Sequence, residues 1–207
     1  MMKIAVLDDY LRLSQTVADW SPLKSTCEIT VFDRHIERGE AARVLAPFDV
    51  LVTLRERMPI DDALLGELPN LKMIAITGLY NRTLDAAAAK RRGIVVSFTE
   101  LRGTYRKATS ELTWGLIFAV ARHIPHEAAR MREGGWQSTI GITLAERTLG
   151  LVGLGRQGKH VLPVAKALGM KVIAWSPNLT DERAAEAGVR RVSKEELFST
   201  SDIVSIH

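Results

Sequence analysis

The sequence predicts an α/β protein with parallel sheets, and two observations support this prediction. Short apolar runs alternate along the chain with stretches of helical character, which is typical of β-α-β units. A glycine-rich motif in the last third of the chain follows one such run and opens a helical segment. In the part that precedes this motif, strands are expected at 4–7, 28–32, 50–53, 73–76 and 94–96.

Helices are expected between these strands. Residues 61–68 and the alanine-rich residues 83–92 have helical character, and Gly93 is placed to end the second helix. The elements up to this point make a complete small α/β domain. We expect this domain to span residues 1–104 and a second domain to span residues 105–207.

Composition excludes several classes of protein. With 46% hydrophobic and 25% charged residues, the 207-residue chain is ordinary for a globular protein of two small domains. The net charge is +4, but the basic residues are scattered, so no nucleic-acid partner is expected. Cys27 is the only cysteine, no signal peptide is evident, and the strongly apolar segment 112–121 is too short to span a membrane. We therefore expect a cytoplasmic protein with no membrane partner.

The glycine-rich motif is the most informative feature of the sequence. The apolar run from Leu149 ends in Gly153, Gly155 and Gly158, which have the G-x-G-x-x-G spacing of dinucleotide-binding loops. An amphipathic segment follows over 161–168, and an apolar run at 171–175 completes a β-α-β unit. This context on both sides predicts a nucleotide-binding unit.

Each glycine of the motif has a separate expected role. Gly153 permits the tight turn out of the strand, and Gly155 lets the backbone N–H groups of Arg156 and Gln157 approach a pyrophosphate. Gly158 lets the helix pack close to the strand. An anion is then stabilised at the helix N-terminus by unpaired N–H groups and the helix dipole. The alternative is a glycine-rich turn that binds nothing.

One long helix is expected over residues 107–123, and it is apolar on all sides. Leu112, Leu116, Ala119 and Val120 lie on one side, and Trp114, Ile117, Phe118 and Ala121 lie on the other. Such a helix has to be buried all round, either inside the protein or against a second copy of the chain. Of the two, we favour a subunit interface.

Two loops of the first domain are expected to face a ligand, because ligands of open parallel sheets bind beyond the carboxyl ends of the strands. They are residues 54–59 and 77–81. Gly78 would expose backbone N–H groups to a carboxylate, and Arg55 or Arg57 would add a charge-assisted hydrogen bond. Alternatively, the arginines are solvated and Gly78 only shapes a turn.

Taken together, these motifs resemble the D-isomer-specific 2-hydroxyacid dehydrogenase family, which contains phosphoglycerate dehydrogenases and glyoxylate/hydroxypyruvate reductases. The resemblance covers the whole chain and rests on several motifs in the same order. They are Thr-Gly-Leu-Tyr-Asn at 77–81, Asp-Ala-Ala-Ala-Ala at 85–89, Arg-Gly-Ile-Val-Val at 92–96, Ala-Thr-Ser-Glu-Leu-Thr at 108–113, Trp136, the glycine motif at 148–158, and Ser-Asp-Ile-Val-Ser-Ile-His at 201–207.

The resemblance implies a flavodoxin-like N-terminal domain followed by the first part of a Rossmann doubly wound parallel sheet. It also implies an oxidoreductase that transfers hydride between NAD or NADP and a small 2-keto or 2-hydroxy acid, as a homodimer through the 107–123 helix. The substrate-binding candidates are Arg55, Gly78, Leu79 and Asn81; the cofactor-binding candidates are Thr109, Gly153, Gly155, Arg156, Gln157, Gly158, Ser176 and His207. By this resemblance, Thr109 lies near the nicotinamide and His207 lies beside the cofactor.

The sequence departs from the family at the end of the second nucleotide-domain strand. The family often carries an acidic residue there to bind the ribose, whereas this chain has Ser176, with no arginine beside it in the sequence. Asp181 is expected to belong to a helix that Thr180 caps, so NAD and NADP both remain open. Pro163 lies inside the preceding helix, and a kink near Lys159 is expected.

The chain ends at His207, and the arginine, glutamate and histidine that act in catalysis in the family lie beyond that point. His35, His160 and His207 are not placed to protonate a substrate, so we expect no catalytic residue within the chain. His123 and His126 lack an evident third ligand, and no metal is expected. We therefore expect a truncated form of a dehydrogenase that is inactive alone. The alternative is a non-catalytic NAD(P)-binding sensor or scaffold protein.

Overall fold

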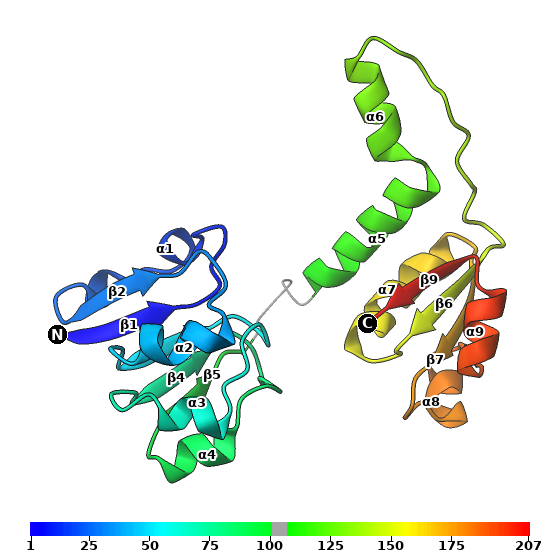
Figure 1. The fold of residues 1–207 in the computed structure, drawn as a ribbon. Coiled ribbons are helices and arrows are strands. Elements are labelled where there is room, and N and C mark those ends of the chain that lie inside the picture. The colour runs from blue at the N-terminus through cyan, green and yellow to red at the C-terminus, as the bar shows by residue number, and fades with distance from the viewer. Residues whose placement is uncertain (101–106) are drawn as a thin grey trace. The chain divides into compact units, whose positions relative to one another are not determined.

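The computed structural model describes residues 1–100 and 107–207. The chain divides into two compact units, Met1–Leu101 and Arg102–His207. Each unit has its own parallel sheet and its own hydrophobic core (Figure 1). The domain boundary expected between residues 104 and 105 lies outside the described residues. Among the described helices, none is both long and apolar enough to cross a membrane.

The sheet of the first unit has the strand order β2-β1-β3-β4-β5, all parallel, which is that of the flavodoxin-like domain implied by the family resemblance. Its strands are β1 (Met2–Val6), β2 (Cys27–Val31), β3 (Val50–Thr53), β4 (Met73–Ile76) and β5 (Val95–Phe98). The bounds of β3 and β4 are those expected, and those of the other strands differ by one or two residues. The carboxyl ends of the parallel strands all lie at one edge of this sheet.

The helical elements of the first unit are α1 (Ser14–Val17), the 3₁₀ turn η1 (Ser21–Leu23), α2 (Arg38–Leu45), α3 (Asp62–Gly66) and α4 (Ala86–Arg91). Helices α3 and α4 are shorter than expected, and an aspartate at the N-cap fixes where each of them begins. The carboxylates of Asp61 and Asp85 accept hydrogen bonds of 2.8 Å from Leu64 N and Ala88 N. Gly93 follows α4 with a φ of +72°, as its expected role at the helix end requires.

The sheet of the second unit has the order β8-β7-β6-β9, again all parallel, which is the first part of a Rossmann sheet. Its strands are β6 (Thr148–Val152), β7 (Lys171–Trp175), β8 (Arg190–Arg191) and β9 (Ile203–Ile206). The sequence did not predict β8, because two exposed arginines form no apolar run.

Three helices connect these strands: α7 (Arg156–Ala167), α8 (Asp181–Glu186) and α9 (Lys194–Thr200). Helix α7 continues past Pro163, and Gly169 follows its end with a φ of +70°. Thr180 caps α8, since its hydroxyl accepts a hydrogen bond of 3.3 Å from Arg183 N. The cap predicted for this helix is therefore confirmed.

The helix expected over residues 107–123 is present with bounds within one or two residues of those expected, and a second helix that the sequence did not predict follows it. Helix α5 (Ala108–Ala121) ends before His123, which has a φ of +53°, and α6 (Ile124–Arg132) begins there with Pro125 in its first turn. Proline has no backbone N–H and fits the first turn of a helix but not its interior, so the chain restarts at this point.

Helix α5 is buried on one side only. Trp114, Ile117 and Ala121 are buried, whereas Leu116 and Val120 are 57% and 75% exposed. The expectation of burial on every side is therefore not met within the chain, because nothing in the described residues covers this second face.

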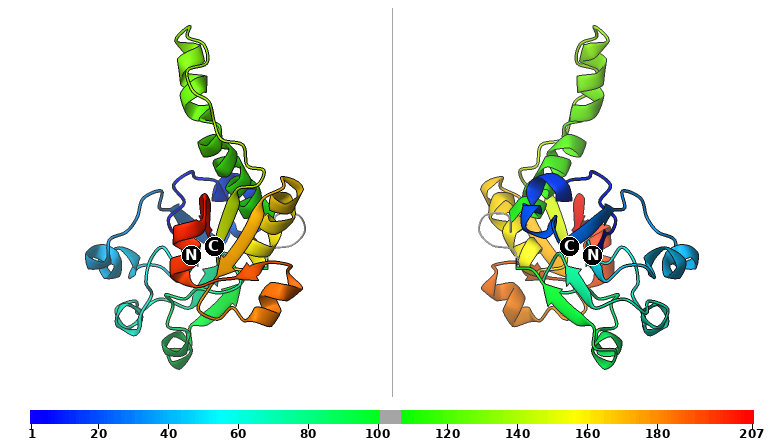
Figure 2. Two further views of the ribbon diagram at one scale, coloured as in Figure 1. Left: turned by 90° about the vertical axis from the view of Figure 1, so that its right-hand side faces the viewer. Right: turned by 90° about the vertical axis from the view of Figure 1, so that its left-hand side faces the viewer.

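Helix α6 and the segment that returns from it project away from the sheet of the second unit (Figures 1 and 2). Glu127 joins helix α6 to the segment that returns from it. Its carboxylate accepts hydrogen bonds from the hydroxyl and backbone N–H of Thr139 at 2.6 and 2.7 Å and from Ser138 at 3.1 Å. These bonds, with that of the Thr139 hydroxyl the strongest, lower the pKa of Glu127 to about 2. Glu127 is thus ionised at neutral pH and fixes the returning segment to the helix.

Candidate functional site

The glycine loop connects β6 to α7, and two of its glycines are required by close packing. Gly153 has a φ of +108°, and its N–H donates to Trp175 O at 2.8 Å, which ties the loop to the end of β7. A Cβ atom at Gly158 would collide with the carbonyl oxygen of Gly153. Helix α7 therefore lies directly against the loop, as expected from the motif.

Gly155 is different, because a Cβ atom there would meet no atom within 4 Å. It is the N-cap residue of α7, and it has no side chain to accept from the first N–H groups of that helix. Lys159 N, which donates to Gly155 O at 3.0 Å, is the first helical N–H with an acceptor among the described residues. The N–H groups of Arg156, Gln157 and Gly158 thus remain as donors beside an open space, and this arrangement fits a diphosphate.

Two further candidates lie next to the loop. His207 follows β9 and donates its N–H to Val152 O at 3.0 Å, and its carbonyl oxygen would be 2.9 Å from a Cβ atom at Gly153. Burial lowers the pKa of the His207 imidazole below its usual value of 6.5, so this side chain is neutral at pH 7. Ser176 follows Trp175 and is therefore also brought to the loop.

The remaining cofactor candidates differ in their surroundings. Gln157 has a buried Oε1 atom without a hydrogen-bond partner among the described residues. Thr109 is exposed in the first turn of α5, where its carbonyl accepts from the Thr113 hydroxyl at 2.9 Å. The described hydrogen bonds thus do not join Thr109 to the glycine loop.

In the first unit, the substrate candidates lie together at the carboxyl ends of β3 and β4. Asn81 Nδ2 donates to Arg55 O at 3.0 Å, and Nη1 of Arg55 lies 3.7 Å from the position of a Cβ atom on Gly78. Gly78 has a φ of +155°, and its own N–H donates to Ile76 O at 3.0 Å. The backbone N–H of Gly78 is therefore already engaged. Of the backbone donors expected around Gly78 and Leu79, this leaves the N–H of the exposed Leu79.

Arg57, the alternative to Arg55, is exposed, but its guanidinium is engaged by neighbouring residues. Its guanidinium donates to Asp8 O at 2.8 Å and lies 4.7 Å from the centre of the Tyr10 ring. The buried carboxylate of Asp8 contacts the Tyr10 hydroxyl at 3.1 Å and His35 Nδ1 at 3.0 Å. Sequence analysis missed the contact with His35, because the two residues are 27 positions apart. This contact also engages one nitrogen of the imidazole.

Asp8, Tyr10 and Arg57 border an apolar hollow of about 600 Å³ at the carboxyl ends of β1 and β3. Thr53 also lines it, with a buried hydroxyl that has no partner among the described residues. The hollow therefore extends along the same sheet edge as the substrate candidates.

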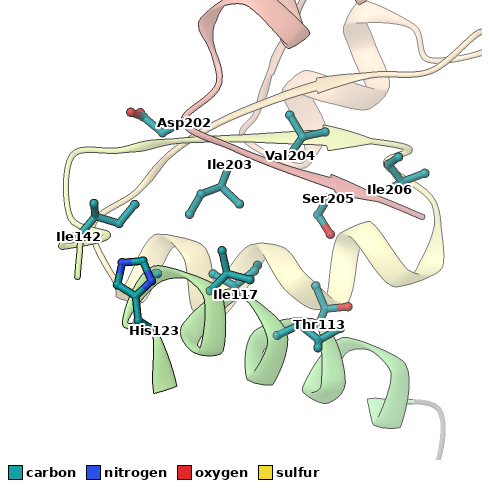
Figure 3. Close-up of a pocket in the computed structure, with 12 residues that line it drawn as sticks. Thr113, Ile117, His123, Ile142, Asp202, Ile203, Val204, Ser205 and Ile206 are labelled. Carbon is teal, nitrogen blue, oxygen red and sulfur yellow. The ribbon is translucent and has the colours of Figure 1, made fainter. Parts of the chain in front are cut away.

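A second apolar hollow lies in the second unit between α5 and β9 (Figure 3). It has a volume of about 640 Å³, and Leu116, Val120, Ile203 and Ile206 are among the residues that line it. Ile203 points from β9 toward α5 in this view. None of the predicted substrate- or cofactor-binding residues lines this hollow. It is therefore separate from the glycine loop.

Gly150 is a packing position beside the motif to which sequence analysis gave no role. A Cβ atom at this position in β6 would collide with the Ser201 hydroxyl and lie 2.9 Å from Cδ2 of Leu197. Helix α9 can approach the sheet only because Gly150 has no side chain. The signal was present in the sequence as a glycine inside an otherwise apolar strand.

Within the described residues, no group of three His, Cys, Asp or Glu side chains could hold a metal ion. Of the two histidines considered as ligands, His126 contacts the Ser138 hydroxyl through Nε2 at 3.0 Å. His123 lies at the break between α5 and α6.

Comparison with known proteins agrees with this geometry. Residues 114–207 match the family model described as D-isomer specific 2-hydroxyacid dehydrogenase, NAD binding domain. The chain is 34% identical over 182 residues to a hydroxypyruvate reductase of Thermotoga maritima, with 87% of this chain and 58% of that protein aligned. It is 33% identical over 187 residues to a D-3-phosphoglycerate dehydrogenase of Synechocystis, with 89% of this chain and 33% of that protein aligned.

The fold is also that of solved relatives. A phosphoglycerate oxidoreductase from Vibrio cholerae superimposes with a TM-score of 0.85 at 34% sequence identity, over 100% of this chain and 66% of that one. The chain thus spans between about one third and two thirds of the length of these relatives.

The two sheets and the glycine loop define a protein with a Rossmann-type dinucleotide-binding unit. The chain belongs to the D-isomer-specific 2-hydroxyacid dehydrogenase family. The expected cofactor class, NAD or NADP, is confirmed at that level.

Proposed function

We propose that the chain supplies the substrate-side loops and the dinucleotide-binding surface of an NAD(P)-dependent 2-hydroxyacid dehydrogenase. The observation that carries this proposal is the set of free N–H donors at the start of α7, beside the open space at Gly155. When bound, the nicotinamide cofactor supplies the hydride that reduces C2 of a 2-keto acid, or accepts it in the reverse direction.

The residues of this chain would bind and orient. The backbone N–H groups of Arg156 and Gln157 hold the diphosphate, because the helix N-terminus is electropositive and their donors are unpaired. Neutral His207 borders the same loop without adding charge. On the substrate side, Leu79 N–H and the Arg55 guanidinium are the donors for a carboxylate, in line with the 3.7 Å approach of Arg55 to Gly78. Thr109 is the candidate on the nicotinamide side.

Carbonyl reduction also needs a proton donor, and the described histidines are poorly suited to this role. His35 has one nitrogen engaged with Asp8, Nδ1 of His160 is buried on α7, and His207 lies against the glycine loop. We therefore propose that these 207 residues bind NAD(P)H without catalysing turnover. General acids typically contribute about 10²–10⁴-fold to such rates.

The test combines binding with turnover. The purified chain is titrated with NADH and NADPH in a calorimeter, and the same protein is then incubated with each cofactor and hydroxypyruvate or glyoxylate. We expect saturable binding and no oxidation of NAD(P)H above a protein-free blank. Absence of binding would remove the proposed function, whereas steady turnover would show that a proton donor is present within the chain.

A second candidate function is a non-catalytic NAD(P)-binding sensor or scaffold that acts through its oligomeric state. The open face of α5 favours it, since Leu112, Leu116 and Val120 recur at helical spacing and are exposed. Binding that leaves the sedimentation coefficient unchanged would count against this candidate.

The same face is our proposed homodimer contact. Replacing Leu116 with glutamate (Leu116→Glu) places a charge in the middle of this apolar face, and we expect the dimer to dissociate at least about tenfold more readily, or about 1.4 kcal/mol. Sedimentation equilibrium measures this shift. Ser199→Glu, on the exposed side of α9, is the matched control and is expected to leave the dimer unchanged. Equal dissociation constants for the wild type and Leu116→Glu would exclude α5 from the contact.

A further inference from the structure

The turn that follows β7 lies where Rossmann proteins bind the adenosine ribose of a dinucleotide. Gly153 N donates to Trp175 O at 2.8 Å, and Leu179 N donates to Ser176 O at 3.1 Å, so a tight turn stands directly beside the glycine loop. In Rossmann sheets an acidic side chain at this point binds the ribose 2′-hydroxyl, and an arginine accommodates a 2′-phosphate. The residue at this point here is Ser176, which has a hydroxyl and no charge.

The carboxylates nearest in sequence are both engaged elsewhere. Asp181 pairs with Arg191 at 3.3 Å. Glu182 accepts hydrogen bonds from its own backbone N–H and from the Thr180 hydroxyl, and these lower its pKa. Both carboxylates are therefore held by other groups and do not take the place of the missing acidic residue.

Arg183 lies at this turn in the folded structure, although it is not adjacent to Ser176 in the sequence. Nη1 of Arg183 donates to Asn178 O at 3.2 Å, which fixes the guanidinium at the turn. Among the ion pairs formed by the described residues, none involves Arg183, so its charge is uncompensated and its other N–H groups remain as donors. Arg183 belongs to the first turn of α8, and its contact with Asn178 places it at the turn although it lies seven positions after Ser176 in the sequence.

A second cation lies close by. Nζ of Lys194 is 5.7 Å from the centre of the ring of Trp175, the residue that precedes Ser176. The surroundings of the turn therefore favour an additional negative charge on the ligand.

We propose that Arg183 and Ser176 form a 2′-phosphate site that makes NADP(H) the preferred dinucleotide of this chain. This inference rests on the proposed dinucleotide-binding function. The guanidinium donates to phosphate oxygens in a charge-assisted, bidentate manner that a lysine or an amide does not reproduce. The Ser176 hydroxyl donates to the same phosphate without repelling it.

Calorimetric titration of the 207-residue chain with NADP⁺, NAD⁺, 2′,5′-ADP and 5′-ADP tests the proposal. We expect each 2′-phosphorylated ligand to bind at least about tenfold more tightly than its partner. Arg183→Gln should abolish this ratio by weakening NADP⁺ and 2′,5′-ADP while leaving NAD⁺ unchanged. Ser176→Asp should reverse the preference, because its carboxylate repels the phosphate and accepts from the ribose hydroxyl.

Arg190→Gln is the matched control, since Arg190 is an exposed arginine of the same sheet that pairs with Glu196 at 2.6 Å. It should keep the wild-type ratio. Equal affinities of the wild type for NADP⁺ and NAD⁺ would overturn the inference, and so would a preference for NADP⁺ that survives in Arg183→Gln. If none of the four ligands binds, the proposed function itself fails, which is a different result from either of these.

Discussion

Replacing Gly155 with valine is expected to abolish dinucleotide binding and to leave the fold intact. The backbone at Gly155 is extended, with a negative φ of −79° that needs no glycine, and a Cβ atom there would meet no protein atom within 4 Å. The added methyl groups would instead fill the open space beside the N–H groups of Arg156 and Gln157. A diphosphate would then be kept from its donors.

For Gly155→Val we expect a dissociation constant for NADP⁺ or NAD⁺ at least about 100-fold weaker, or about 2.7 kcal/mol. The free energy of unfolding should change by less than about 0.5 kcal/mol, as for other substitutions at exposed positions. Calorimetric titration measures the first quantity and urea unfolding the second.

Gly39→Val is the matched control for this experiment. Gly39 lies in the first turn of α2, and a Cβ atom there would also meet nothing within 4 Å. Its substitution should affect neither binding nor the cooperativity of unfolding. If Gly155→Val binds either dinucleotide as tightly as the wild type, the diphosphate does not lie at the start of α7.

The elements that the sequence predicted best are those whose signal is local. The bounds of β3, β4 and β7 were those expected, because apolar runs of four or five residues fill each strand. Strand β8 escaped prediction because Arg190 and Arg191 are exposed at the edge of the sheet and make no apolar run. The end of α5 was expected within two residues, whereas α6 (Ile124–Arg132) escaped prediction because its mostly polar residues make no apolar run.

The site shows the same division between local and tertiary information. The glycine spacing located the loop, since Gly153, Gly155 and Gly158 act within ten residues of β6. The position of Arg183 at the turn after β7 depends on how α8 begins, and the contact between Asp8 and His35 joins the ends of two neighbouring strands. Such contacts form only after the sheet is assembled, so no pattern of adjacent residues predicts them.

The second large effect concerns the fold itself, and it is expected for Gly158→Ala. The Cβ atom of this alanine would collide with the carbonyl oxygen of Gly153, which is a backbone atom and cannot rotate away. Helix α7 would have to move from the loop, and we expect the second unit to lose about 1–3 kcal/mol of unfolding free energy, as in other overpacked sites. Urea unfolding followed by tryptophan fluorescence measures this loss, because Trp114 and Trp175 both belong to the second unit.

Gly150→Ala separates this loss of stability from the loss of binding. Its Cβ atom would press on Ser201 and Leu197 of the α9 side rather than on the glycine loop, so it should destabilise the same unit while the folded molecules retain their dinucleotide affinity. Gly158→Ala should lower both the stability of the second unit and its dinucleotide affinity, because the displaced helix carries the N–H donors with it. Unchanged stability of Gly158→Ala would mean that α7 does not pack against Gly153 and that the geometry of the loop derived above is wrong.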